Sequence, residues 1–329
     1  KRNRLVRYYN KFFFVSTGGA EPSIYKKIYD ENGILTTCLE MKGAVKSQAN
    51  FYGVNMRLYD GEDDGLKNTY EWWFNLREDA WYSGVYFEPY GINSLREEVG
   101  TKKKYFNIFP GFKMRRVINY KPDSEKVKEY GERIYNHIYE VWCSNDLKLT
   151  TTLLAWLRRL VVVGKVTQIM VVLYSREHGS GKSMWWEHFL EQVIGDKMYS
   201  KTADLMNLIG SQFTEGVMNK ILCMIEEIPQ FKWDGSRGSG AVWSKLKSYV
   251  TDPIQQGQQK YKGTETFKSW LNIVGLTNNP NCVHPEMFFR RVIGIAISNS
   301  KVSDPRYHTE LKEALERYDA WEYFTHIYL

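Results

Sequence analysis

One stretch, residues 169–194 (IMVVLYSREHGSGKSMWWEHFLEQVI), constrains the fold of this chain more than any other. It opens with a continuous apolar run, residues 169–174, which is typical of a strand buried on both faces. A turn rich in glycine and serine follows, and the apolar residues after it recur with the period of a helix. Gly195 stands where a helix C-terminal cap is expected. The stretch therefore predicts a strand, a glycine loop and a helix in direct succession.

The glycine loop has the composition of a phosphate-binding site. Its glycines let backbone N–H groups turn inward at a helix N-terminus, where they converge on an anion. Lys182 can reach terminal phosphates, and the Ser183 hydroxyl can bind Mg²⁺, as in the pattern G-x-x-x-x-G-K-[ST]. The first glycine of that pattern is replaced by Arg176, and an ordinary strand–turn–helix is the alternative interpretation. The predicted phosphate-binding residues are Gly179, Ser180, Gly181, Lys182 and Ser183.

Composition narrows the class of protein. With 329 residues, 43% of them hydrophobic, the chain can bury a real core and is long enough for two domains or one domain with an accessory region. Its apolar runs are far shorter than the roughly 18 residues of a membrane helix, so no membrane contact is expected. Four scattered cysteines without a C-x-x-C pair argue against disulfides and zinc, and indicate an intracellular protein. The net charge of +7 is compatible with a polyanionic partner.

The two ends of the chain give weaker signals. Residues 1–120 alternate aromatic and polar positions between glycines, which predicts a β-rich accessory region of short strands and hairpins without assignable chemistry. Residues 121–164 carry two amphipathic helical patterns, which fit an oligomerisation collar or a simple linker equally well. Because the chain opens on Lys1 and has no signal-peptide pattern, we expect it to be a piece of a longer polypeptide.

Apolar runs predict a mainly parallel sheet at the centre of the chain. The strand candidates are residues 169–174, 221–225, 271–276 and 292–297, and helical segments separate most of them. That order is typical of an α/β fold whose sheet is covered on both faces. Ligands of such sheets bind at the carboxyl ends of the strands.

Polar residues stand at the ends of these runs. Glu226 and Glu227 follow the second run, where one carboxylate can hold Mg²⁺ through water and the other can polarise the attacking water. Asn279 follows the third run, and its amide can hold that water, although an Asx-turn before Pro280 is the alternative. Paired acids are also common on protein surfaces.

Two basic features complete the pattern. Arg290 and Arg291 precede the fourth run; an arginine there can stabilise transition-state charge in a neighbouring subunit, or simply form a surface salt bridge. Lys260, Tyr261 and Lys262 lie in a polar segment between glycines, which predicts a hairpin that contacts nucleic-acid phosphates and stacks on a base. A merely exposed hairpin is the alternative.

The order of glycine loop, Glu-Glu, basic hairpin, Thr-Asn-Asn and Arg-Arg resembles motifs A, B, B′ and C and the arginine finger of superfamily-3 helicases. These are compact AAA+ motors of viruses, phages and mobile elements. The segments YFNIFPGF, YEVWCSNDL and GSGKS are similar to the poxvirus-type and phage-plasmid primase–helicase branch. The resemblance implies an ATP-dependent replicative DNA helicase, a ring-shaped homo-hexamer moving 3′ to 5′ on single-stranded or forked DNA. A primase domain or a polymerase is an expected partner, and the host cytoplasm or a viral replication site is the expected location.

The resemblance also implies roles for single residues. Lys182 and Ser183 would bind the ATP phosphates and Mg²⁺, Glu226 and Glu227 would form motif B, and Asn279 would be the motif C asparagine. Arg291 matches the finger best, with Arg290 second, and Lys260 and Lys262 match the DNA-contacting hairpin. The expected ATPase core spans residues 165–300, and a C-terminal helical segment spans 301–329. A non-unwinding packaging or scaffold ring and a small-molecule kinase with a phosphate loop are the alternatives.

Overall fold

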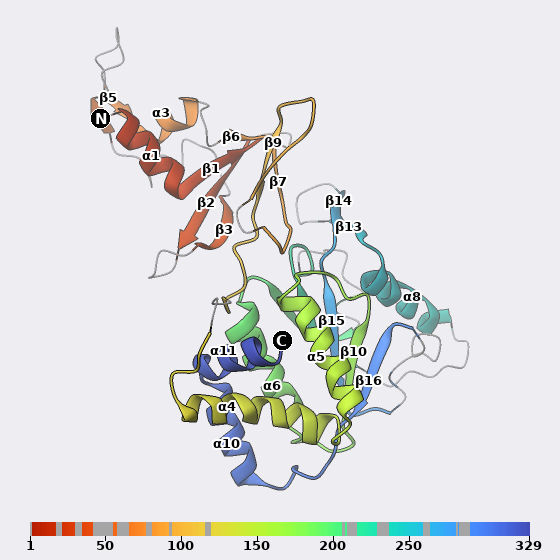
Figure 1. The fold of residues 1–329 in the computed structure, drawn as a ribbon. Helices are drawn as coiled ribbons and strands as arrows, with labels where there is room; N and C mark the ends of the chain where they lie inside the picture. Colours follow the sequence, from red (N-terminus) through yellow and green to blue (C-terminus); the bar gives the residue numbers. More distant parts are fainter. Residues whose placement is uncertain are drawn as a thin grey trace. The chain divides into compact units, whose positions relative to one another are not determined.

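A computed structural model gives the fold of the chain in two compact units, Lys1–Gly111 and Phe112–Leu329 (Figure 1). The described residues are 2–17, 22–29, 35–41, 55–57, 66–76, 81–91, 94–115, 120–205, 208, 216–228, 237–258, 264–280, 282 and 290–329. Within these ranges every helix is too short or too polar to cross a lipid bilayer.

The described residues of the first unit form short strands and two helices (Figure 1). Its elements are α1 (Arg2–Phe12), β1 (Phe13–Ser16), β2 (Ser23–Tyr29), β3 (Leu35–Met41), β4 (Asn55–Arg57), β5 (Leu66–Asn68), α3 (Thr69–Leu76), β6 (Trp81–Tyr82), β7 (Gly84–Tyr86), β8 (Leu95–Glu97) and β9 (Lys104–Asn107). Among the described strands, one sheet has the order β3-β2-β1-β6 and another β7-β9-β8. The region predicted as short strands and hairpins also contains helix: the stretch YYNKFFFV is divided between α1 and β1. Tyr9 on α1 stacks on Trp73 of α3, and this aromatic contact anchors the helix over the sheet.

The second unit is built on a five-stranded parallel sheet with the strand order β11-β12-β15-β10-β16. Its strands are β10 (Met170–Tyr174), β11 (Tyr199–Asp204), β12 (Leu222–Glu227), β15 (Asn272–Thr277) and β16 (Val292–Ala296). This confirms the predicted α/β class and parallel sheet, and each predicted strand lies within two residues of its apolar run. The sequence missed β11. Its polar sequence, YSKTAD, suits a strand that has β12 as its one neighbour among the described strands, at the edge of the sheet.

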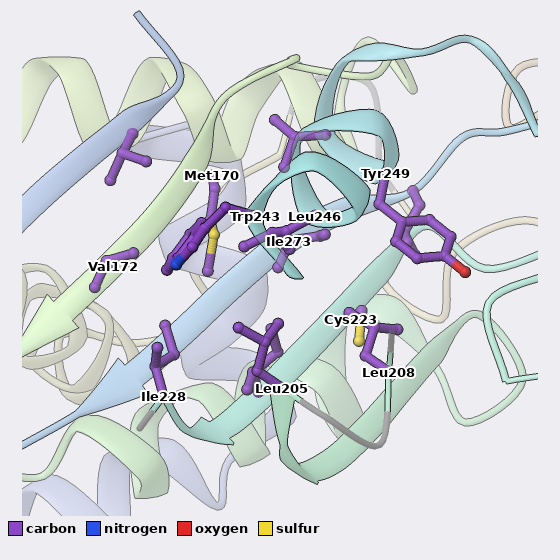
Figure 2. Packing of buried hydrophobic residues seen from close by; sticks show 14 of the residues in the cluster. Met170, Val172, Leu205, Leu208, Cys223, Ile228, Trp243, Leu246, Tyr249 and Ile273 are labelled. Atoms are coloured by element: carbon purple, nitrogen blue, oxygen red, sulfur yellow. The ribbon is translucent and has the colours of Figure 1, made fainter. Parts of the chain in front are cut away.

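Both faces of the sheet are buried. Figure 2 shows Met170, Cys223 and Ile273, from three neighbouring strands, packed with Trp243 of helix α8 (Arg237–Thr251). Cys223 lies opposite Ile273, and Met170 and Ile273 directly precede the pair Val171↔Val274, so the three side chains share one face. The intervening residues Val171 and Leu173 are also fully buried. Burying each such side chain stabilises the fold by roughly 1.5–3 kcal/mol, which explains why these runs are continuous and apolar.

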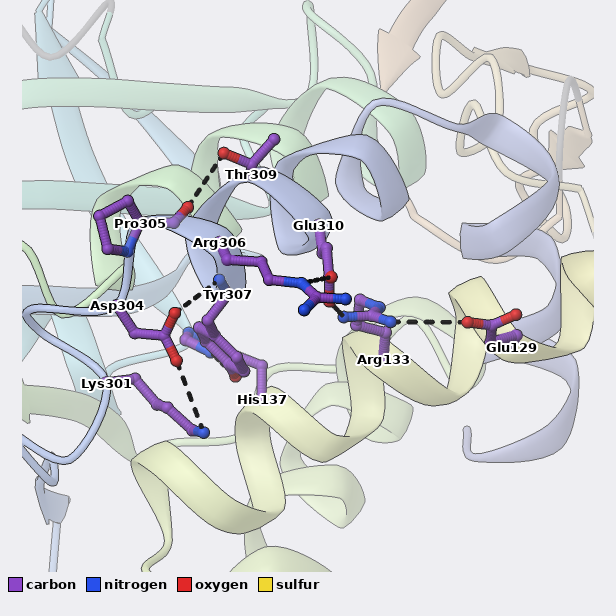
Figure 3. Close-up of polar contacts among 10 residues, drawn as sticks. All are labelled: Glu129, Arg133, His137, Lys301, Asp304, Pro305, Arg306, Tyr307, Thr309 and Glu310. Carbon is purple, nitrogen blue, oxygen red and sulfur yellow. Dashed lines mark hydrogen bonds and ion pairs between the residues drawn. The ribbon is translucent and has the colours of Figure 1, made fainter.

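Helices that come before, between and after the sheet strands in the sequence pack against one another. They are α4 (Glu125–Asn136), the π-helical turn η1 (His137–Trp142), α5 (Leu147–Val161), α6 (Lys182–Phe189), the π-helical turn η2 (Leu190–Ile194), α10 (Pro305–Leu315) and α11 (Tyr318–Ile327). Helix α4 contacts both α10 and α11. In Figure 3, Arg133 of α4 donates to Glu310 of α10. Residues 121–164, for which the sequence predicts a collar or a linker, belong to the same compact unit as the sheet, and which of the two roles they have stays a prediction.

An antiparallel hairpin follows α8. Strands β13 (Ile254–Gln258) and β14 (Thr264–Lys268) pair with the register Gln258↔Thr264. The hairpin predicted for this segment is therefore present. Lys260, Tyr261 and Lys262 stand between its strands in the sequence and lie outside the described residues.

Candidate functional site

The glycine loop lies where the sequence placed it, between the end of β10 and the start of α6. The backbone N–H of Ser175 donates to the carbonyl of Thr277 at 3.1 Å, so the loop begins beside the end of β15. Gly179 and Gly181 have φ angles of 83° and 78°, which residues with a side chain rarely adopt. Gly181 is also the N-cap of α6, so the loop delivers the chain directly into a helix N-terminus.

A pocket of about 510 Å³ opens over this loop, at the carboxyl ends of the parallel strands. That volume lies within the range of small-molecule sites. The residues that line the pocket are His178, Gly179, Ser180, Gly181, Lys182, Ser183, Met184, Glu226, Glu227, Asn278, Val302 and His308. The fold thus gathers the whole predicted loop and both acids around one cavity.

Lys182 places a buried positive charge in the wall of the pocket. Its side chain is only 8% exposed, and its Nζ donates to Asn278 Oδ1 at 3.3 Å. Burial lowers the pKa of Lys182, and the negative charge of Glu227 offsets part of that effect. An ammonium group that has lost most of its water and bonds a neutral amide is poorly compensated. The pocket therefore favours an anion beside Lys182.

Ser180 provides another hydrogen-bond donor in the same pocket. The residue is 2% exposed, lines the pocket, and its Oγ has no hydrogen-bond partner within the described part of the chain. Buried hydroxyl groups are normally paired, so an exception calls for a ligand or a water. Phosphate oxygens would satisfy both Ser180 and Lys182. Ser183 and the two glutamates supply the oxygen ligands that Mg²⁺ prefers, so the residues present fit a magnesium-bound polyphosphate.

The adjacent carboxylates have different surroundings. Glu226 forms an ion pair with Lys201 of β11, with 2.8 Å between Glu226 Oε1 and Lys201 Nζ. Glu227 instead accepts a hydrogen bond from Asn279 Nδ2 at 3.2 Å. The two acids line the same pocket, but one is tied to a cation at the sheet edge and the other to an amide at the end of β15. They can therefore play separate parts.

Asn278 is a pocket residue that sequence reasoning missed. It lines the cavity, contacts Lys182, and its Nδ2 donates to the carbonyl of Ser175 at 2.8 Å. The predicted Asn279 is not among the lining residues and reaches the site through Glu227. The pair follows β15 directly, and the sequence contains no signal for which amide faces the loop. Val302 and His308 were missed for a similar reason, because they come from the segment after β16.

The two predicted finger residues are not pocket residues of their own subunit. Arg290 is exposed and Arg291 is half-buried. The carbonyl of Arg291 accepts the backbone N–H of Met170 at 2.7 Å, which fixes this point of the chain beside the start of β10. Their roles stay predictions.

Comparisons with known proteins find one matching family model and solved structures with a similar fold. Residues 173–291 match the model of a family of unknown function (DUF5906). No curated protein sequence matches the chain. The A-form apo structure of the NrS-1 C-terminal region is similar at 18% identity and a TM-score of 0.65, over 98% of this chain and 68% of that chain. Another apo structure of that region gives a TM-score of 0.66 at the same identity and coverage.

An X-ray structure of JCV helicase also matches, at 15% identity over 59% of this chain and 53% of that chain, with a TM-score of 0.36. A score this low establishes no common fold. At 18% identity, the likeness to the NrS-1 region shows that the two chains share a fold.

Proposed function

We propose that this chain is the ATP-hydrolysing part of a replicative DNA helicase, of the superfamily-3 type found in viruses, phages and mobile elements. The observation that carries the proposal is the buried Lys182 ammonium, which faces a pocket with the unpaired Ser180 hydroxyl and two carboxylates. A triphosphate supplies the negative charge that this arrangement lacks. The order of motifs in the sequence and the parallel sheet with the loop at its carboxyl edge support the same conclusion.

The pocket residues divide the work of hydrolysis. The loop N–H groups, Ser180 and Lys182 hold the phosphates, and Ser183 with Glu226 holds Mg²⁺. When bound, Mg²⁺ neutralises charge on the phosphate oxygens. Glu227 takes the proton of the attacking water and Asn279 orients that carboxylate, because the two side chains are hydrogen-bonded.

The proposed motor is a homo-hexameric ring in which neighbouring subunits complete each other's sites. Arg290 and Arg291 stand outside the pocket of their own subunit, and Arg290 is exposed, so an arginine is available to a nucleotide in a neighbour. We assign single-stranded or forked DNA as the track, with movement 3′ to 5′. A primase domain or a polymerase is the proposed partner in replication.

Contact with DNA is assigned to Lys260, Tyr261 and Lys262 on the ground of their sequence between the paired strands β13 and β14. Lys260→Ala should keep the DNA-independent ATP turnover and lose its stimulation by DNA.

The test is ATP hydrolysis with and without single-stranded DNA, followed by unwinding of a forked duplex. Lys182→Ala should lower turnover by at least ~100-fold, as expected for loss of a charged group at the transferring phosphate. Lys148→Ala, at an exposed position at the start of α5, is the control and should behave as wild type.

The outcomes separate the rival functions. Turnover that DNA does not stimulate would indicate a packaging or scaffold ring instead of a motor. Full activity as a monomer, unchanged after removal of both arginines, would indicate a small-molecule kinase.

A further inference from the structure

A three-member ion cluster borders the proposed site at the edge of the sheet. The Nζ of Lys201 lies 2.8 Å from Glu226 Oε1 and 2.6 Å from Glu187 Oε1. The three residues come from three elements: Lys201 from β11, Glu226 from β12 and Glu187 from α6. One ammonium group therefore bridges a pocket carboxylate and the helix that follows the glycine loop.

The register of the sheet explains this contact. Strands β11 and β12 are parallel, with Lys201 opposite Met224 and Asp204 opposite Glu227. Glu226 is thus two positions further along the pair than the residue opposite Lys201, on the same face, and a lysine can span that diagonal. Glu226 lines the pocket, whereas Lys201 does not.

We propose that Lys201 is a positioning residue that restrains Glu226 while the site is empty and, when a metal–nucleotide complex binds, releases Glu226 and stays paired with Glu187. The inference rests on the proposed function. In this exchange of partners, the Glu226 carboxylate turns from the Lys201 ammonium to the metal. Lys201 remains paired with Glu187 throughout.

Electrostatics makes this exchange possible. Lys201 and a divalent cation compete for one carboxylate, because two positive charges near Glu226 repel each other. Each of the three side chains is more than a third exposed, at 38%, 44% and 40% for Lys201, Glu187 and Glu226, so water and salt screen the ion pairs. Pairs of this kind are weak enough to separate at little cost. Glu187 already holds the Lys201 ammonium at 2.6 Å, so the lysine keeps a partner when Glu226 turns away.

A direct binding measurement tests the proposal. Mn²⁺, which prefers the same oxygen ligands as Mg²⁺, is titrated into protein saturated with ATPγS, and free Mn²⁺ is followed by electron paramagnetic resonance. Lys201→Met should tighten Mn²⁺ binding ~2- to 5-fold, the range expected for loss of an exposed ion pair. Glu187→Gln should weaken binding by a similar factor, because Lys201 then has no partner but Glu226.

The double variant distinguishes an exchange of partners from a general effect of charge. If Glu187 acts only by receiving Lys201, Glu187→Gln should change nothing in the Lys201→Met background. Lys201→Arg keeps the charge and should bind Mn²⁺ as wild type does. Lys197→Met removes an exposed charge just before β11 and should have no effect.

Additive effects of the two substitutions, or a shift from Lys197→Met as large as that from Lys201→Met, would overturn the proposal. A separate result would contradict the proposed function itself: a wild-type protein that does not bind ATPγS.

Discussion

At the scale of single residues, two adjacent amides have different contacts and should have different effects. Asn278 touches Lys182 at 3.3 Å, whereas Asn279 touches Glu227 at 3.2 Å. Asn278→Ala should weaken ATP binding ~10-fold or more, since a hydrogen bond to a charged group contributes about 1.5–3 kcal/mol. Asn279→Ala should leave ATP binding nearly unchanged and lower turnover ~100-fold, because the carboxylate that activates water loses its orientation.

Equilibrium binding of a fluorescent ATP analogue and steady-state turnover separate these effects. Equal losses in both measurements for the two variants would show that the amides act as one structural unit.

The same pair shows what a sequence can and cannot predict about a site. The glycine loop and the Glu-Glu pair depend on residues that are close in the chain, so spacing alone places them correctly. Whether Asn278 or Asn279 faces the loop depends on how the backbone turns after Thr277, where the Asn279 N–H donates to the threonine hydroxyl at 3.0 Å. The Lys201 contact depends on a strand that the sequence did not predict.

A buried histidine gives a prediction about pH. His137 is fully buried beside Gly181, and its Nδ1 lies 2.9 Å from the hydroxyl of Tyr307 (Figure 3). Burial, with a smaller effect from His308, lowers the pKa of His137 to about 3. The unfolded chain takes up this proton near pH 6.5 but the folded chain does not, so the contribution to stability is complete above pH 6.5 and is lost as the pH falls toward 3.

Between pH 7 and pH 4.5 this one group should lower the free energy of unfolding by about 2.5 kcal/mol. Urea denaturation at the two pH values measures the loss, and His137→Gln should show a loss smaller by that amount. His178→Gln, at an exposed position, is the control and should keep the wild-type difference. Identical pH dependence in His137→Gln and wild type would show that the imidazole is protonated in the folded state.

At the scale of elements, close packing of α4 on α11 depends on a glycine. A Cβ added at Gly131 would lie 2.3 Å from Cδ1 and 2.9 Å from Cβ of Tyr323. The ring atom could move, but the Tyr323 Cβ is fixed by its own helix, so the helices must separate. Gly131→Ala should therefore destabilise the second unit by about 1–3 kcal/mol, the usual range for overpacking, despite the better helix propensity of alanine.

Thermal and urea unfolding measure this change. Gly216→Ala adds the same methyl group where none of the described residues comes within 4 Å, and it should stay within about 0.5 kcal/mol of wild type. A more stable Gly131→Ala protein would mean that α11 does not pack on α4 as described.

Elements also differ in how well the sequence predicts them. The buried strands β10, β12, β15 and β16 are apolar because both their faces are covered, so composition alone identifies them. Among the strands that the structure describes, β11 pairs with β12 only, and it carries Lys201 and Asp204, so its sequence resembles a loop. The helical period after the glycine loop was predicted correctly, but its change to the π-helical turn η2 gives no sequence signal.

At the scale of the whole molecule, the proposed ring requires that each ATP site be shared by two subunits. A Lys182→Ala subunit lacks the phosphate-binding lysine but keeps both arginines, and an Arg290→Ala/Arg291→Ala subunit has the opposite defect. Each homogeneous variant should lose at least ~100-fold in turnover, because each lacks a charge that acts on the transferring phosphate.

Mixing the two inactive proteins should restore part of the turnover, since the arginine variant can bind ATP and receive an arginine from a Lys182→Ala neighbour. For the wild-type protein, turnover per subunit should rise with protein concentration over the range in which the ring assembles, because a site is complete only beside a neighbouring subunit. Mixed proteins that assemble but stay inactive would place the arginines outside the neighbour's site. Wild-type turnover in the arginine variant would show that hydrolysis needs no arginine from a second subunit. Lys182, Glu227 and Asn279 of one chain would then be enough to hydrolyse ATP.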